Sequence, residues 1–225
     1  MSAAEDLVTT PPEAPPGCPL CPRLVAYRQE NAAAHPDWYN RAVPSWGDEA
    51  GAVRLLVVGL APGVQGANRT GRPFTGDYAG DLLYATLLKL GLASGEYERR
   101  KGDTLRLHGV MITNAVRCVP PQNKPTAAEV NTCRDYLRAR IAALPGLRAL
   151  LCLGKVSHDS TVRALGGRVA ALRFAHEAAF EMEGPNGPLT LVSSYHCSRY
   201  NTNTGLLTEA MFESATARAQ RAAGL

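Results

Sequence analysis

The chain has 225 residues, of which 45% are hydrophobic and 20% charged, and its formal net charge is +4. This length allows one large domain or two small ones, with a core that needs no disulfides. No apolar run approaches the eighteen or so residues of a membrane helix. The first seventeen residues carry acidic groups and no apolar segment, unlike a secretory signal. We expect a cytoplasmic protein without membrane contact, in which residues 1–17 are a disordered leader. The slight basic charge is weakly consistent with a polyanionic partner and decides nothing alone.

Four apolar runs predict strands, at residues 53–59, 109–116, 148–154 and 189–195. The first three are almost continuously apolar and lack proline, as in strands buried on both faces. Helical patterns separate them, at residues 81–91, from Thr126 to about 144, from near Val156, and from about Leu206 to the C-terminus. Strands that alternate with helices predict an α/β protein with a parallel sheet covered on both faces.

Two local signals refine this prediction. Thr126 and Glu129 have the spacing of a helix capping box. The turn "GPNGP" at residues 184–188 predicts a hairpin that leads into the last strand. Because there is no internal repeat and no long linker, we expect residues 18–225 to form a single domain.

The loop "GLAPGVQGANRTGRPFTGD", residues 59–77, follows the first strand and is rich in glycine. Ligand sites in parallel sheets lie at the carboxyl ends of the strands, where this loop, "TNAVRCVPPQNKP" and "YHCSRYNTNTG" are expected to meet. Together they offer a ring (Phe74), an amide (Asn114), a carboxylate (Asp77) and an imidazole (His196). Each has an ordinary structural explanation when taken singly, but the set describes one pocket. The loops lack both nucleotide-binding glycine motifs.

Six cysteines include a C-x2-C pair, Cys18 and Cys21, and a second pair, Cys118 and Cys133, separated by fourteen residues. In a cytosolic chain such a pattern favours a metal site over disulfides. Four thiolates suit either zinc or an iron–sulfur cluster, and the spacing does not decide between them. Cys152 is most simply a small buried hydrophobe.

The segments "GLAPG", "RTGRPFTGD", "ITNAVRCVPPQNKP" and "YHCSRYN" together resemble the motifs of the uracil-DNA glycosylase superfamily, and the cysteine pattern is similar to that of its iron–sulfur members. The resemblance covers residues 18–203. Leu60 stands where the fourth family has glutamate, and "YHCS" replaces its His-Pro-Ser. Both departures point to the fifth family, also called type B.

This resemblance implies a three-layer α/β/α sandwich around a four-stranded, mainly parallel sheet. It also implies a structural [4Fe–4S] cluster held by Cys18, Cys21, Cys118 and Cys133. The implied activity is a monofunctional DNA glycosylase of base excision repair, with no diffusible cofactor. Such an enzyme flips uracil, or another deaminated base, out of double-stranded DNA and hydrolyses its N-glycosidic bond. We expect a monomer.

The resemblance also implies a role for each residue of the pocket. Asp77 would support the cationic sugar or orient water, and His196 would stabilise charge on the leaving base. Phe74 would stack on the base and Asn114 would read its edge. Gly63 stands where a bulky ring is found in classical members, so a wider pocket is expected. Arg199 and Tyr200 are expected to contact a phosphate and to wedge into the base stack.

One departure concerns the catalytic acid, because Ala61 stands where classical members have an aspartate. Two alternatives therefore stay open. A non-catalytic, metal-stapled nucleic-acid-binding module would share the charge and cysteines without needing Asp77 or His196. An unrelated α/β transferase would use the glycine-rich loop without needing the cysteines.

Overall fold

The computed structural model describes residues 10–225, and its centre is a six-stranded sheet with the strand order β1-β5-β2-β6-β8-β7. β5, β2, β6 and β8 are parallel, and the edge strands β1 and β7 are antiparallel to their neighbours. The strands are β1 (Trp46–Gly47), β2 (Leu55–Gly59), β5 (Val110–Asn114), β6 (Ala149–Leu153), β7 (Ala179–Gly184) and β8 (Gly187–Ser194).

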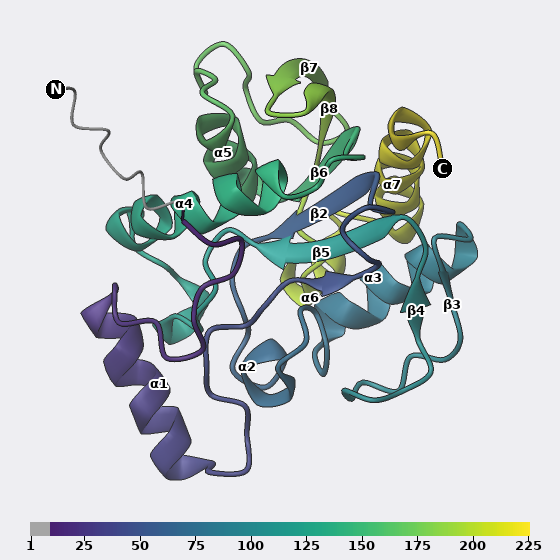
Figure 1. The fold of residues 1–225 in the computed structure, drawn as a ribbon. Coiled ribbons are helices and arrows are strands. Elements are labelled where there is room, and N and C mark those ends of the chain that lie inside the picture. Colours follow the sequence, from purple (N-terminus) through teal and green to yellow (C-terminus); the bar gives the residue numbers. More distant parts are fainter. Residues whose placement is uncertain (1–9) are drawn as a thin grey trace, which may run out of the picture.

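Helices cover both faces of this sheet (Figure 1). α4 (Ala127–Ala142) and α5 (Lys155–Ala164) pack on one face, and α3 (Tyr78–Lys89) and α7 (Glu209–Ala223) on the other. The predicted three-layer sandwich is therefore confirmed. The remaining elements are α1 (Pro22–Ala34), α2 (Ala67–Thr70), the 3₁₀ turn η1 (Pro121–Asn123), α6 (Arg199–Asn203) and a small hairpin of β3 (Ala93–Ser94) and β4 (Arg106–Leu107).

The alternation of side chains along β2 shows why its sequence is continuously apolar. Leu55 and Val57 enter the core beneath α3 and α7, whereas Leu56 and Val58 enter the core beneath α4 and α5. All are fully buried, and each such burial stabilises the fold by roughly 1.5–3 kcal/mol. Cys152 on β6 is likewise fully buried in the second core, as the sequence predicts.

The four predicted strands form the parallel centre of the sheet, and one antiparallel strand is added at each edge, so the sheet has six strands where four were expected. β1 is only two residues long, too short for any periodicity, and β7 is partly exposed along its length. Neither has the continuous apolar run that marks the inner strands. The predicted "GPNGP" turn does join β7 to β8, and Thr126 and Glu129 do form a capping box at α4.

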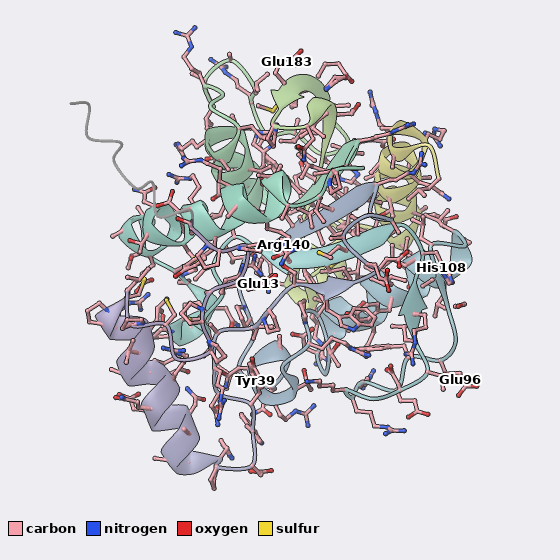
Figure 2. All side chains as sticks on the ribbon, in the orientation of Figure 1. Glu13, Tyr39, Glu96, His108, Arg140 and Glu183 are labelled. Atoms are coloured by element: carbon pink, nitrogen blue, oxygen red, sulfur yellow. The ribbon has the colours of Figure 1, made fainter. Side chains whose placement is uncertain are left out.

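Residues 1–9 of the predicted leader lie outside the described residues, but its remainder packs against the domain. Glu13 accepts hydrogen bonds from the guanidinium groups of Arg117, at 2.9 Å, and Arg140, at 2.5 Å, and from the backbone N–H of Ser45. Glu13 and Arg140 lie side by side in Figure 2. Arg117 is 1% exposed, so Glu13 offsets a charge that has little access to water.

We predict that Glu13→Ala lowers the free energy of unfolding by roughly 1–3 kcal/mol, because it leaves buried guanidinium groups without their carboxylate. This corresponds to a fall in Tm of about 2–4 °C for each kcal/mol. Thermal unfolding followed by circular dichroism measures it. Glu183→Ala, at an exposed position of β7, is the control and should change stability by less than about 0.5 kcal/mol. Equal effects of the two substitutions would contradict the prediction.

Candidate active site

The carboxyl ends of β2 and β5 lie at the same level, because Gly59 pairs with Asn114 in their parallel register. A cavity of about 700 Å³ opens there. Its walls include all five residues predicted for the base pocket and the chemistry, together with one of the two predicted for DNA contact: Gly63, Phe74, Asp77, Asn114, His196 and Arg199. The structure thus brings together residues spread over more than 130 positions of the chain.

Phe74 and His196 form two walls of this cavity. Their rings are nearly parallel, with an interplanar angle of 26° and centroids 6.0 Å apart. The ring of Phe74 and the amide of Asn114 both lie against Gly59, where a Cβ atom would overlap Asn114 Oδ1 and come within 2.6 Å of the phenyl ring. A glycine at the end of β2 is therefore required for this arrangement.

Asp77 is the N-cap of α3, and its Oδ1 accepts a hydrogen bond from the backbone N–H of Gly80 at 3.2 Å. Its other oxygen faces the glycine-rich loop, where a Cβ at Gly66 would overlap it and a Cβ at Gly63 would lie 3.0 Å away. Burial raises the pKa of Asp77, opposed by the hydrogen bond from Gly80, and the charge of nearby Asp81 raises it further. A carboxylate in this position is a stronger base than one in water.

His196 follows β8, and no side-chain hydrogen bond to its ring exists within residues 10–225. Burial lowers its pKa to about 4. The imidazole is therefore neutral at physiological pH and presents one N–H donor and one acceptor. Its neighbour Cys197 is fully buried and points away, with its sulfur 3.4 Å from the carbonyl oxygen of Ala79, so the two residues form no nucleophilic pair.

Asn114 is 3% exposed, and its Oδ1 has no hydrogen-bond partner among the described residues. Buried polar atoms are nearly always paired in folded proteins. An unpaired acceptor in the wall of a cavity is free to accept a hydrogen bond from a molecule bound there.

The two residues predicted for DNA contact open α6 directly after the N-cap Ser198. The guanidinium of Arg199 lies over the ring of Tyr78, 5.3 Å from its centroid. Tyr200 is 74% exposed, the most exposed large hydrophobic side chain in the described part of the chain. An aromatic side chain this exposed, next in sequence to a residue of the cavity wall, is available to a partner.

The sequence did not identify three further residues of the cavity wall, Asp81, Arg99 and Asn123. Arg99 forms a bidentate ion pair with Asp81, at 2.8 and 2.6 Å. Asn123 and the preceding Gln122 both have φ of +56°, a costly conformation for residues other than glycine that clusters at functional sites. The flanking prolines signal a rigid loop but not which residue of it faces the cavity.

The four cysteines of the predicted metal site border a second, apolar cavity between α1 and α4, together with Leu24 and Val116. The backbone N–H of Arg117 donates to Cys133 Sγ at 3.3 Å. Burial raises the pKa of Cys118 to about 12 and that of Cys133 to about 11, so both thiols hold their protons unless a cation is beside them. No group of three described His, Cys, Asp or Glu side chains has the geometry to hold a single metal ion.

Comparison with known proteins places this architecture in a family. The family model of the uracil DNA glycosylase superfamily matches residues 45–220, which include the whole main sheet and the named wall residues of the first cavity, from Gly63 to Arg199. The chain therefore belongs to the uracil-DNA glycosylase superfamily.

Within the superfamily, the chain is similar to the type-5 members. It is 44% identical to the type-5 uracil-DNA glycosylase of Thermus thermophilus over 92% of this chain and 94% of the relative. It is 39% identical to the type-5 enzyme of Pyrobaculum aerophilum over 92% and 89% of the two chains. The type-4 enzyme of the latter organism is 32% identical over 80% and 76%. The assignment from Leu60 and "YHCS" is confirmed.

Within the described residues, no helix is long and apolar enough to cross a membrane.

We predict that the ring of His196 takes up a proton only near pH 4, because burial disfavours the charged form. The unfolded chain accepts this proton near pH 6.5, so the folded state loses stability as the pH falls from about 6.5 to 4. His196→Gln removes this contribution and should flatten the acid limb of a Tm-against-pH profile. An NMR titration in which the His196 ring protonates near pH 6.5 in the folded protein would refute the prediction.

Proposed function

We propose that this protein is a DNA repair glycosylase that flips uracil out of double-stranded DNA and hydrolyses its N-glycosidic bond, leaving an abasic site. The observation that carries the proposal is the convergence of Asp77, Asn114 and His196 on one cavity large enough for a base. The names of the type-5 relatives support it.

Recognition of the base rests on the unpaired acceptor of Asn114. Uracil presents an N3–H donor to Asn114 Oδ1, whereas cytosine presents an acceptor at the same place and would leave the amide unpaired. A buried group left unpaired costs about 1–3 kcal/mol, which protects ordinary cytosine. Stacking on the ring of Phe74 contributes roughly 1–3 kcal/mol, which offsets the few kcal/mol spent in extracting the base.

Cleavage develops positive charge on the sugar and negative charge on the departing base. Asp77 supplies a carboxylate near the sugar, either to stabilise the cation or to orient water. His196, neutral because it is largely shielded from water, donates its N–H to the base oxygen that gains charge. No lysine lines the cavity within residues 10–225, so a Schiff base is not expected, and we propose a monofunctional enzyme.

Arg199 and Tyr200 are proposed to hold the DNA. The Arg199 guanidinium would contact a phosphate, and the exposed ring of Tyr200 would enter the gap that the flipped nucleotide leaves in the stack. We further propose that residues 18–225 act as one catalytic domain and as a monomer.

The direct test incubates the protein with a duplex containing one uracil and then treats the DNA with alkali, which cuts abasic sites. Strand cleavage that requires both protein and alkali supports the proposal. Binding without any cleavage would instead support the alternative, a non-catalytic nucleic-acid-binding module.

Asp77→Asn separates chemistry from folding, because asparagine is also a good N-cap and keeps the acceptor for Gly80. We predict that uracil excision falls by roughly 100-fold. The free energy of unfolding at pH 7 should stay the same or rise, because the raised pKa of Asp77 means that its ionised form costs stability at that pH. Single-turnover assays and chemical denaturation measure the two effects. Asp37→Asn, at an exposed position, is the matched control and should alter neither.

We propose that Cys18, Cys21, Cys118 and Cys133 hold a [4Fe–4S] cluster with a structural role. The four thiols border one cavity, and such a set of soft donors suits iron–sulfur or zinc. A single ion needs all its ligands around one centre, whereas a cluster takes each thiolate on a different iron atom. The site would tie the segment before α1 to the loop after β5 and to α4.

Iron content tests this assignment. We predict that Cys133→Ser lowers the iron bound per chain and removes the brown colour of the purified protein. Cys152→Ala, which replaces a buried thiol of the second core, should leave both unchanged. Finding about one zinc and no iron in the unmodified protein would exclude the cluster while keeping a metal site.

We also propose that the pocket accepts other deaminated bases, such as hypoxanthine, whose N1–H offers Asn114 the same donor. Gly63 adds no side chain to the cavity wall, and an open pocket discriminates weakly by size, by about 1–3 kcal/mol.

Gly63→Ala tests the role of size with the smallest added group. Its Cβ already lies 3.0 Å from Asp77 Oδ2, so the carboxylate must shift slightly, and a larger side chain would displace it further. We predict that hypoxanthine excision falls more than uracil excision, measured as the ratio of the two single-turnover rates. A proportional loss of both activities would show that selectivity arises elsewhere, for example in base flipping.

A further inference from the structure

Phe74 has a backbone conformation that a phenylalanine rarely adopts, with φ of +52°. The left-handed region costs a residue other than glycine roughly 1–2 kcal/mol, and such strain persists only where neighbouring contacts enforce it. The ring is nevertheless buried at the wall of the cavity, 7% exposed. Some part of the fold must therefore hold this short segment in place.

The carbonyl groups of Pro73, Phe74 and Thr75 are each bound by a side-chain hydroxyl. Tyr84 donates to the first at 2.6 Å and Tyr97 to the second at 3.2 Å, and Thr70 donates to the third at 3.0 Å. The Tyr97 hydroxyl also accepts the backbone N–H of Gly76 at 3.1 Å. It thereby bridges the two sides of the loop between Phe74 and Asp77.

A buried arginine of the same glycine-rich loop ties it to Asp103. Arg72 is 3% exposed and makes a bidentate ion pair with Asp103, with both N–O distances 2.7 Å. Its Nε donates to the Thr75 hydroxyl at 2.7 Å. The guanidinium also lies over the ring of Trp46, 4.7 Å from its centroid. An ion pair so deeply buried fixes its partners because separating them would leave an uncompensated charge.

Tyr97 and Asp103 belong to one stretch of chain, residues 95–104, between β3 and β4. This 95–104 segment is not one of the loops that follow the parallel strands and build the cavity. It also carries Arg99, whose ion pair with Asp81 lies in the cavity wall. Three of its side chains thus reach the loop that carries Phe74 or the first turn of α3.

We propose that the 95–104 segment is the positioning element of the base pocket, in which Tyr97 and Asp103 fix the Phe74 ring and so set the size of base that the pocket accepts. Neither residue touches the base; both are positioning residues. This inference rests on the proposed function, because it assigns the cause of selectivity in that same site. The ring can stack only where its backbone is held, and displacements near 1 Å are enough to slow an enzyme substantially.

The test uses Tyr97→Phe, which removes one hydroxyl and keeps the ring packed, and Asp103→Asn, which keeps the shape but removes the charge. The control is Tyr39→Phe, because the Tyr39 hydroxyl also donates to a backbone carbonyl, that of Ala42 at 3.2 Å, but lies outside the cavity wall. Single-turnover rates are measured on duplexes containing uracil and 5-hydroxymethyluracil, which share the edge facing Asn114 and differ in size. DNA affinity and Tm are measured in parallel.

We expect Tyr97→Phe to slow uracil excision by about 10-fold, less than the 100-fold loss that full misplacement can cause. The affinity for DNA should stay within about 2-fold, and the preference for uracil over the larger base should change by at least about 3-fold. Asp103→Asn should act in the same direction, and Tyr39→Phe should change neither rate. If Tyr97 only stabilised the fold, Tyr97→Phe would lower Tm. The ratio of the uracil and 5-hydroxymethyluracil excision rates, each measured per folded molecule, would stay unchanged.

Unchanged rates and an unchanged ratio in Tyr97→Phe, with a fully active unmodified protein, overturn the inference and leave the proposed function standing. Failure of the unmodified protein to release uracil overturns the proposed function itself. The two failures are therefore distinguishable in one experiment.

Discussion

The end of β2 is the point on which the candidate active site depends. Gly59 stands level with Asn114 on the neighbouring parallel strand, and it has no side chain. The Phe74 ring and the Asn114 amide occupy the space where a Cβ would project. Because β2 is held in the sheet on both sides, it cannot move aside for a larger residue. The ring, the amide and the cavity between them exist together only because this position is glycine.

The cavity combines a carboxylate that is destabilised by burial with an imidazole that stays neutral. The N-terminus of α3 partly stabilises the ionised form of Asp77, because its backbone N–H groups and the helix dipole favour negative charge. His196 has no such support and remains uncharged. At neutral pH the ionised form of Asp77 therefore costs stability, which other contacts must offset. Asp77, which caps α3, needs little rearrangement when charge develops in a reaction.

The cysteine cavity and the candidate active site share one loop. The segment starts at Asn114, the last residue of β5, in the wall of the first cavity. It continues through Arg117 and Cys118 beside the second cavity and returns to the first at Asn123. Glu13 binds Arg117 from the N-terminal side. A metal held by the four cysteines would stiffen a segment whose two ends line the base pocket, so a structural cofactor would act on the pocket through the backbone.

The inner strands, the capping box and the turn before β8 could be predicted from the sequence, because each is a pattern of neighbouring residues. The set Phe74, Asp77, Asn114 and His196 was also predictable in outline, since parallel strands deliver their carboxyl ends to one edge. Only the tertiary structure decided the rest. β1 is too short to show any periodicity, and Glu13 meets Arg117 and Arg140 across 104 and 127 positions. Tyr97 and Asp103 reach the Phe74 loop from a separate hairpin. Pairings between residues so far apart leave no periodicity in a single sequence, because they are selected by packing in three dimensions.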